Sequence, residues 1–484
     1  MRLLPRRHDV SVLYLAFIDY MVIVGSFAVI MRMRFRPHID IIDISRLHII
    51  PQVLFIFFYA ALMLGVFSAL GLYKRKLWLS PLWHSIQIVK GTVISIIGYI
   101  FLQYISKSSL FMEYRSVTFS WAMVLPLCLW FHRVIIFDQF RKFVSKSDWR
   151  RRVVIIGASD IGKEFAEKCL SGQDYPTLKI VGFLDDQVPE GEPVSEKLKC
   201  LGQIASLPEI IDLYNIEGAV VTSSRLSYQQ LIDTAEECVR LFGWVDIHSD
   251  KALCLQENLD PDTYFEIPFV RMGDIPKSVL MKSYKRISDF ILSGLGILLL
   301  SPVFLITAVL IKLTSPGPVL YISERIGYKE SIFKFYKFRS MRVGADNDVG
   351  RKEKMEEFIQ NEDSALSSKI ISKEYLTPVG RLIRKWAIDE LPQLFNVWKG
   401  DMSIVGPRPS PVDEYAVNDE WHKKRFEIKP GCTGLWKLYA AQTGSLFSQS
   451  VLYDIYYARN MNPLLDLYII LGTIRLILEG KADQ

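Results

Sequence analysis

Residues 376–409 read LTPVGRLIRKWAIDELPQLFNVWKGDMSIVGPRP, and they decide what the C-terminal part of the chain builds. Two adjacent carboxylates, Asp389 and Glu390, stand between a basic stretch and the Pro-Arg-Pro loop at 407–409. Carboxylates surrounded by fixed cations suit chemistry on phosphate groups, where developing charge must be neutralised. The stretch therefore predicts a site that handles a phosphate ester.

The residues just before the acids have the spacing of an amphipathic helix. In 378–387 the apolar side chains recur at helical intervals, and the polar positions between them are basic. These cations are Arg381, Arg384 and Lys385. The pattern places a row of positive charge directly before the two carboxylates.

Asp389 has the position of an N-cap, with Glu390 in the first turn of the next helix and Pro392 tolerated there. Carboxylates at a helix N-terminus are kept ionised by free N–H groups and by the helix dipole. Neighbours at i and i+1 do not share a helix face, so we expect the two acids to have separate roles. An acidic pair that only caps the helix is the structural alternative, and the surrounding arginines disfavour it.

Other cations lie on both sides of this stretch. Proline on either side stiffens the backbone of Arg408, which suits a fixed anion clamp. Upstream, Lys337 and Arg339 belong to a basic, aromatic, strand-like run that follows the turn at 316–318. Its cations could hold the domain on anionic lipid at the membrane surface, or they could bind a diphosphate. Different residues of the run can serve the two purposes. The polar stretch 346–373 is expected to form helix and loop.

The N-terminal 148 residues contain four apolar runs, at about 10–30, 49–72, 86–105 and 117–137. Each is close to the ~20 residues that cross a bilayer as a helix. The sequence therefore predicts four transmembrane helices, and the basic cluster after the fourth places both termini in the cytoplasm. Asp19 lies inside the first run, where it either has a function or pairs with another residue of the bundle.

A fifth apolar segment, 287–311, is long enough to span but is interrupted by Ser301 and Pro302. Proline removes a backbone hydrogen bond and kinks a helix. The segment is either a kinked fifth span or a re-entrant helix that bends and returns, and Ser301 could satisfy the carbonyl freed by the kink. Only the re-entrant form keeps the residues after Lys312 on the cytoplasmic side.

Between the membrane region and this segment, 149–275 alternates predicted strands and helices, which indicates a Rossmann-like α/β domain with a parallel sheet. Gly157 and Gly162 match a nucleotide-binding turn in part, because Ser159 replaces the middle glycine. A regulatory or dimerising domain is favoured over a cofactor-binding one, and we expect a homodimer.

The predicted fold class is a membrane α-helical bundle plus α/β. It consists of four transmembrane helices (1–148), a Rossmann-like domain (149–275) and a mainly α catalytic domain (276–484) with a re-entrant helix at about 286–312. The net charge of +6 is mild, and basic residues cluster beside apolar segments, which fits lipid headgroups or phosphates rather than nucleic acid. The six cysteines and seven histidines lack metal-site spacing.

Three motifs occur in the order typical of one family: KFRSM (337–341), GRLIRK with DELPQLFNVWKGDMSIVGPRP (380–409), and PGCTGL (430–435). They resemble the monotopic phosphoglycosyl transferases, bacterial sugar transferases that begin capsule, exopolysaccharide and O-antigen synthesis. The resemblance covers about 280–484. The preceding regions resemble the large members, which include undecaprenyl-phosphate glucose and galactose phosphotransferases. The break at Ser301 and Pro302 matches the re-entrant helix of that family.

The resemblance implies a mechanism. Asp389 matches the nucleophile that attacks the β-phosphate of a UDP-sugar, releasing UMP and forming an aspartyl phosphosugar. Undecaprenyl phosphate then takes the hexose-1-phosphate, giving undecaprenyl-diphosphate-sugar at the cytoplasmic face of the bacterial inner membrane. Glu390 matches the residue associated with Mg²⁺, the expected cofactor. The candidate substrate-binding residues are Lys337, Arg339, Arg384 and Arg408.

The chain departs from the family pattern at Ser323, before Thr377, and after Gly434, where it reads LWKLYAAQTG. These departures affect the nucleotide and sugar pocket more than the acidic pair. Two other functions are open: a nucleotide-sugar dehydratase or epimerase using the Rossmann-like domain, and a non-catalytic scaffold for polysaccharide assembly. The incomplete glycine pattern disfavours the first, and the intact acidic pair disfavours the second. Nothing in the sequence identifies the hexose or the pathway.

Overall fold

The computed structural model describes residues 7–35, 49–70, 72–73, 81–106, 115–136, 150–171, 178–259, 262–264, 267–275, 279–344, 375–440 and 447–480. The chain separates into two compact units. The first is Met1–Arg150 with Ser171–Leu178, and the second is Arg151–Leu170 with Lys179–Gln484. The boundary predicted at 275–276 falls inside the second unit. The stretch 346–373 lies outside the described residues.

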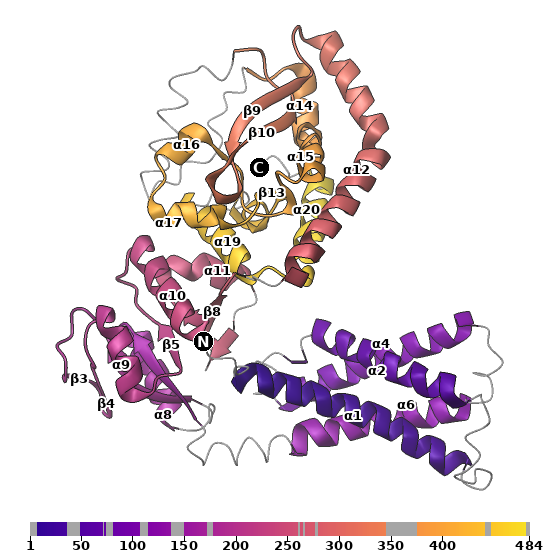
Figure 1. The fold of residues 1–484 in the computed structure, drawn as a ribbon, viewed down its shortest axis with the longest axis vertical. Coiled ribbons are helices and arrows are strands. Elements are labelled where there is room, and N and C mark those ends of the chain that lie inside the picture. Colours follow the sequence, from indigo (N-terminus) through magenta and orange to yellow (C-terminus); the bar gives the residue numbers. More distant parts are fainter. Residues whose placement is uncertain are drawn as a thin grey trace. The chain divides into compact units, whose positions relative to one another are not determined.

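The first unit is a bundle of long apolar helices (Figure 1). They are α1 (Arg7–Phe35), α2 (Ile49–Ala69), α4 (Pro81–Ser106) and α6 (Arg115–Trp130), which continues as a π-helical turn, η1 (Phe131–Ile136). Their shared core is aromatic, with Tyr59, Phe67 and Trp121 fully buried. Many apolar side chains on the outside are exposed, such as Phe58 and Phe119, as expected of helices that meet lipid.

Asp19 is buried in this bundle and paired. The Nε of Arg133 donates to Asp19 Oδ1 at 3.0 Å, and the hydroxyl of Tyr73 donates to Asp19 Oδ2 at 2.9 Å. Arg133 also donates to the carbonyl of Leu72 at 3.0 Å. A charge in an apolar bundle is costly unless it is paired, so the pairing alternative for Asp19 is the one observed.

Two described helices are long and apolar enough to cross a membrane, over Leu15–Met33 and Met281–Thr314. The described apolar parts of α2, α4 and α6 are shorter: Ile56–Ser68, Ser85–Phe101 and Phe119–Ile135. The four predicted N-terminal transmembrane helices therefore exist as helices, and membrane crossing by all four stays a prediction.

The second unit begins with a six-stranded sheet in the order β2-β1-β5-β6-β8-β7. Its strands are β1 (Arg151–Ile156), β2 (Leu178–Leu184), β5 (Gly218–Val221), β6 (Trp244–Ile247), β7 (Asp262–Tyr264) and β8 (Ile267–Gly273). The main helices around it are α8 (Asp160–Ser171), α9 (Leu207–Tyr214), α10 (Tyr228–Phe242) and α11 (Leu253–Asn258). The pairs β1–β5 and β5–β6 are parallel, as predicted, whereas β6–β8 and β7–β8 are antiparallel.

The turn between β1 and α8 needs its glycines. Gly157 has a φ of +100°, and a Cβ there would lie 2.7 Å from Ser223. The turn is also closed by its own side chains. Asp185 Oδ2 accepts from the Ala158 N–H at 2.8 Å, and Ser159 Oγ accepts from the Gly162 N–H at 3.1 Å.

The rest of the unit is the C-terminal domain. It contains α12 (Val279–Thr314), a hairpin of β9 (Leu320–Ile326) and β10 (Ile332–Phe338), α14 (Pro378–Lys385), the 3₁₀ turn η7 (Ile388–Glu390) and α15 (Gln393–Lys399). There follow β11 (Ser403–Val405), β12 (Ser410–Pro411), α16 (Val412–Ala416), α17 (Glu420–Lys423), the 3₁₀ turn η8 (Lys424–Glu427), β13 (Gly431–Thr433), the π-helical turn η9 (Trp436–Ala440), α19 (Phe447–Asn460) and α20 (Pro463–Leu478).

The helix α12 is continuous through Pro302 and bends partway along its length (Figure 1). Pro302 has no N–H for the carbonyl of Leu298, four residues earlier. The hydroxyl of Ser301 donates to that carbonyl at 2.8 Å, so the bond lost at the proline is replaced. Most of the apolar surface of α12 is exposed, for example at Leu299 and Leu305. Such a surface suits lipid.

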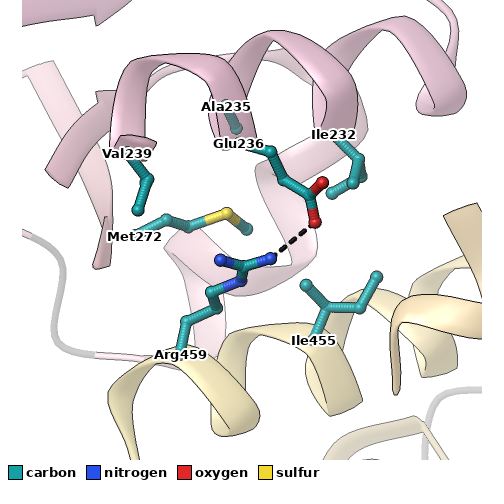
Figure 2. Close-up of a pocket in the computed structure, with 7 residues that line it drawn as sticks. All are labelled: Ile232, Ala235, Glu236, Val239, Met272, Ile455 and Arg459. Carbon is teal, nitrogen blue, oxygen red and sulfur yellow. Dashed lines mark hydrogen bonds and ion pairs between the residues drawn. The ribbon is translucent and has the colours of Figure 1, made fainter. Parts of the chain in front are cut away.

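The Rossmann-like sheet and the C-terminal domain meet where α10 and β8 face α19. Figure 2 shows Glu236 of α10 reaching Arg459 of α19 across a small apolar pocket. The Glu236–Arg459 ion pair is 2.5 Å long, and Lys424 binds the other carboxylate oxygen of Glu236 at 2.7 Å. Tyr228 stacks on Trp421 with ring centroids 5.0 Å apart. The two parts therefore share one continuous packed core.

Candidate active site

The two carboxylates lie on η7, a turn rather than a helix start. Ala387 precedes it in the left-handed region, with a φ of 50°, and the Glu390 N–H donates to the Ala387 carbonyl at 3.2 Å. The helix α15 begins later, at Gln393, with Pro392 as its N-cap. The prediction that Asp389 is an N-cap is therefore wrong. The left-handed conformation of Ala387 leads into the 3₁₀ turn at 388–390, so the helix begins only at Gln393.

Glu390 is held between two lysines instead of by a helix dipole. The Nζ of Lys337 on β10 lies 3.0 Å from Glu390 Oε1, and the Nζ of Lys437 on η9 pairs with Oε2. Burial alone would raise the pKa of Glu390, but the charges of Lys337 and Lys437 hold it well below its usual range. The lowered pKa keeps the carboxylate ionised. The side chain is 26% exposed, so it can also be reached from solvent.

Asp389 lies beside Arg384, which comes from the last turn of α14. The Arg384 Nε is 4.0 Å from Asp389 Oδ2, and the Asp389 side chain is only 7% exposed. Within the described part of the chain, that Nε has no hydrogen-bond partner. This spacing keeps the Arg384 guanidinium beside the Asp389 carboxylate. Asp389 and Glu390 therefore lie beside different cations, and separate roles for the two acids stay a prediction.

The backbone next to this pair is tightly packed. Thr377 caps α14 by accepting from the Gly380 N–H at 2.9 Å. A Cβ on Gly380 would lie 1.9 Å from the carbonyl oxygen of Ser340. The residues just after β10 therefore pack directly against α14, the helix that carries Arg384.

Arg339 was predicted to bind substrate, but its guanidinium is bound to backbone carbonyls. Its guanidinium donates to the carbonyls of Pro316 and Ser315, at 2.8 and 2.7 Å. The residue is 6% exposed. These contacts brace the turn at the end of α12 and argue against a role on the phosphates.

Arg408 is held by a buried cluster of charges. Its guanidinium donates to Glu414 Oε1 at 3.0 Å, and its backbone N–H donates to Asp454 Oδ2 at 3.1 Å. Arg425, which is fully buried, donates to Glu414 Oε1 at 3.3 Å and lies 3.9 Å from Asp454 Oδ2. The cluster fixes the Pro-Arg-Pro loop, as the flanking prolines suggested, and Glu414 already neutralises the side chain of Arg408.

The hairpin separates this cluster from the acidic pair. Lys337 on β10 pairs in register with Tyr321 on β9, whereas Ser410, next to the Pro-Arg-Pro loop, pairs with Ile326. Positions 321 and 326 are roughly 16 Å apart at the usual rise of about 3.3 Å per residue. The structure brings Lys337, Arg384, Asp389 and Glu390 together, and it holds Arg408 at the other end of the hairpin.

The cluster around Arg408 predicts a pH dependence of stability. Burial raises the pKa of Asp454 to about 7, against the opposing effect of Arg425. The folded state therefore holds this proton more tightly than the unfolded chain. The resulting stabilisation is complete below about pH 4 and is lost as the pH rises toward 7. We expect the melting temperature of the protein to fall relative to that of Asp454→Asn between pH 5 and 8.

Two other ionisable groups close to Arg425 do not titrate in that window. The pKa of Glu414 is lowered, because Arg408 and Arg425 outweigh its burial, and burial lowers the pKa of His422 to about 3. Thermal unfolding of both proteins in one buffer series measures the effect. A difference in melting temperature that stays constant from pH 5 to 8 would contradict the assignment.

Lys437 is the functional candidate that sequence reasoning missed. It lies in the stretch LWKLYAAQTG, which stood out only as a departure from the family pattern. A lone lysine in an apolar run after Gly434 was the available signal, because a buried lysine needs a carboxylate partner. Its partner, Glu390, is 47 residues away along the chain.

The donor set fits Mg²⁺ only when the substrate supplies further ligands. Within the described ranges, no group of three or more His, Cys, Asp or Glu side chains could hold a metal. Mg²⁺ commonly binds through one or two carboxylates together with substrate phosphates. Glu390 provides such a carboxylate, and Lys337 and Lys437 would have to release it.

Comparison with known sequences gives the family. The family described as bacterial sugar transferase matches residues 280–480, and the one described as CoA-binding domain matches residues 68–217. The chain is 39% identical to galactosyl transferase CpsE of Streptococcus agalactiae serotype III, over 35% of this chain and 36% of that protein. It is 37% identical to the UDP-N-acetylgalactosamine-undecaprenyl-phosphate N-acetylgalactosaminephosphotransferase of Aeromonas hydrophila, over 43% of this chain and 47% of that protein.

A shorter relative is matched over most of its length. The exopolysaccharide production protein ExoY of Sinorhizobium fredii is 35% identical, over 41% of this chain and 87% of that protein. The chain spans less than half the length of the first two relatives. It belongs to the bacterial sugar transferase family. The resemblance inferred from the three motifs is confirmed.

The Rossmann-like domain does not fit the ligand that the second family description names. A pyrophosphate in such a turn binds backbone N–H groups at the helix N-terminus. Here the Ala158 N–H is taken by Asp185, the Gly162 N–H is taken by Ser159, and Asp160 adds negative charge in the first turn of α8. The Asp185 carboxylate and the Ser159 hydroxyl thus occupy N–H groups that a pyrophosphate would need. We assign no chemical step to this domain.

Proposed function

We propose that this protein transfers a hexose-1-phosphate from a UDP-sugar to undecaprenyl phosphate, giving undecaprenyl-diphosphate-sugar and UMP. The observation that carries the proposal is the buried Asp389 beside Arg384, next to a Glu390 held ionised by Lys337 and Lys437. The relative from Aeromonas hydrophila is named for a reaction of this kind. The product would begin exopolysaccharide, capsule or O-antigen synthesis.

The first chemical step uses Asp389 as the nucleophile. A carboxylate oxygen of Asp389 attacks the β-phosphorus of the UDP-sugar. The bond from that phosphorus to the bridging oxygen breaks, and UMP leaves with the bridging oxygen. Arg384, 4.0 Å from Asp389, is placed to neutralise the charge that develops on the phosphoryl oxygens. The product is an aspartyl phosphosugar.

The second step returns Asp389 to its starting state. A phosphate oxygen of undecaprenyl phosphate attacks the phosphorus of the aspartyl phosphosugar, and the bond to Asp389 breaks. The exposed apolar surface of α12, with Leu299 and Leu305, suits the lipid acceptor and the bilayer. Lys337 comes from the hairpin that follows α12 and is placed to bind the diphosphate.

Mg²⁺ is proposed to enter with the diphosphate and to be held by Glu390. When bound, it would neutralise charge on the diphosphate and polarise its oxygens. Arg339 and Arg408 remain outside this proposal, because their guanidinium groups are taken up by carbonyls and by Glu414. A role for the Pro-Arg-Pro loop in nucleotide recognition would have to use its backbone or the remaining donors of Arg408.

The activity is tested with membranes that contain the protein. They are incubated with Mg²⁺, undecaprenyl phosphate and a panel of UDP-sugars, and release of UMP is measured. We expect activity with one or two sugars, which would also identify the hexose. Absence of UMP release with every sugar, from protein whose melting transition shows that it is folded, would contradict the proposal.

The catalytic part is proposed to face the cytoplasm at the bacterial inner membrane, with α12 entering and leaving the bilayer on one side. Val343 follows β10 and is 70% exposed, so labelling at this position shows which side of the membrane the catalytic part faces. A cysteine in place of Val343 should resist a membrane-impermeant maleimide in intact cells and react after permeabilisation. Unmodified protein measures labelling of the native cysteines. Labelling of Val343→Cys in intact cells would mean that α12 crosses the membrane.

A further inference from the structure

The helix α19 contacts both the Rossmann-like domain and the turn η9. Toward the domain, Arg459 of α19 binds Glu236 of α10, and Ile455 lines the same small pocket (Figure 2). The hydroxyl of Tyr453, also on α19, donates to the carbonyl of Cys254 on α11 at 2.8 Å. The Rossmann-like domain therefore holds α19 through an ion pair, a hydrogen bond and apolar packing.

The ring of Tyr453 makes the contact with η9. It stacks on Tyr439 with ring centroids 5.4 Å apart. Tyr439 comes two residues after Lys437, whose Nζ pairs with Glu390 Oε2. Tyr453 is 1% exposed, so both of its contacts are made away from water. One buried side chain thus joins α11 of the Rossmann-like domain to the turn that carries Lys437.

The position of η9 decides how Lys437 meets the acidic pair. The Lys437 side chain is 8% exposed, and lysines are almost never so buried unless they are paired. Because charges attract strongly in a partly dehydrated site and the attraction falls with distance, a displaced η9 would weaken the pairing of Lys437 with Glu390. The charge balance beside Asp389 therefore depends on what holds η9 in place.

We propose that the Rossmann-like domain positions the active site: it holds α19, and Tyr453 of α19 places η9 so that Lys437 meets Glu390. This role needs no ligand in the domain, which agrees with the closed turn at Gly157. Tyr453 is a positioning residue, because it acts on the site only through η9. The effect on transfer rests on the proposed function, whereas the hold on η9 can be measured without turnover.

The experiment is hydrogen–deuterium exchange of the full-length protein in lipid nanodiscs, measured by mass spectrometry on peptides that cover η9. Tyr453→Phe keeps the ring and removes only the hydroxyl that reaches Cys254. The amides of η9 should exchange about tenfold faster, the factor by which losing one buried hydrogen bond shifts a local opening equilibrium. UMP release at saturating UDP-sugar should also fall by about tenfold, since the transfer depends on precisely placed charges.

A second variant changes the Rossmann-like domain alone. Glu236→Gln removes the carboxylate that pairs with Arg459 and should speed exchange of the same η9 peptides. Its matched control is Glu237→Gln, the same change at the next residue of α10, whose partner Arg240 is 74% exposed. Exchange at η9 and UMP release by the control should equal those of the unchanged protein.

Unchanged exchange of η9 in folded Tyr453→Phe and Glu236→Gln would overturn the inference. Faster exchange spread evenly over the whole chain would also overturn it, because that indicates a general loss of stability. So would faster exchange at η9 that leaves the UMP release of an active protein unaltered. Melting temperatures establish that each variant is folded, and if Tyr453→Phe does not fold, Glu236→Gln carries the same expectation. If the unchanged protein releases no UMP, the proposed function fails, and exchange still decides whether the domain holds η9.

Discussion

Asp389→Asn should abolish UMP release from every UDP-sugar that the unchanged protein accepts. The amide has nearly the same shape as the carboxylate, but it has neither the charge nor the nucleophilic oxygen that attack on phosphorus needs. Loss of a covalent nucleophile commonly lowers the rate by roughly a thousandfold or more. Asp389 is buried beside Arg384, so its surroundings leave little room for water to replace it.

The matched control is Asp401→Asn, which makes the same chemical change at an exposed position after α15. Its rate should remain within about twofold of that of the unchanged protein, as for surface substitutions away from special features. The melting temperature of Asp389→Asn should not fall below that of the control by more than a few degrees. Full activity in Asp389→Asn would exclude Asp389 as the nucleophile.

The second large effect is expected on stability, at the cluster that fixes the Pro-Arg-Pro loop. Glu414 is 1% exposed and pairs with both Arg408 and the fully buried Arg425. Glu414→Gln removes the negative charge and leaves Arg425 with Asp454 at 3.9 Å as its remaining acidic partner in the described cluster. Removing one partner of a buried ion pair costs about 3–5 kcal/mol of unfolding free energy.

Thermal unfolding in detergent measures this loss, with Glu420→Gln as the control. Glu420 pairs with Lys423 at 2.7 Å on the surface, where its side chain is 77% exposed. Surface pairs of this kind contribute at most about 1 kcal/mol. The melting temperature of Glu414→Gln should therefore fall well below that of the control. Equal melting temperatures would show that the buried cluster does not hold the loop together.

Much of the local structure could be predicted from the sequence. The alternation of strands and helices predicted for 149–275 is present, for example in β2 (Leu178–Leu184), α9 (Leu207–Tyr214) and β6 (Trp244–Ile247), because the apolar spacing there is strong and uninterrupted. The helix α14 also begins as predicted, at Pro378, where Thr377 provides its cap. These features could be predicted because they depend only on residues that are close together in the sequence.

What could not be predicted depends on contacts between distant residues or on a single backbone angle. Nothing local indicates that Ala387 adopts a φ of 50° and so delays the start of α15. Arg339 and Arg384 have the same chemistry, and only the fold assigns the first to two carbonyls and the second to Asp389. The pairing of Lys437 with Glu390 is likewise a long-range contact.

The proposed transfer requires a covalent link between Asp389 and the sugar phosphate. The direct measurement is mass spectrometry of the intact protein after incubation with its UDP-sugar and Mg²⁺ in the absence of undecaprenyl phosphate. The expected result is added mass equal to one hexose phosphate, located on the peptide that contains Asp389 and lost when the lipid acceptor is added. Release of UMP without any adduct, or an adduct that persists in Asp389→Asn, would contradict it.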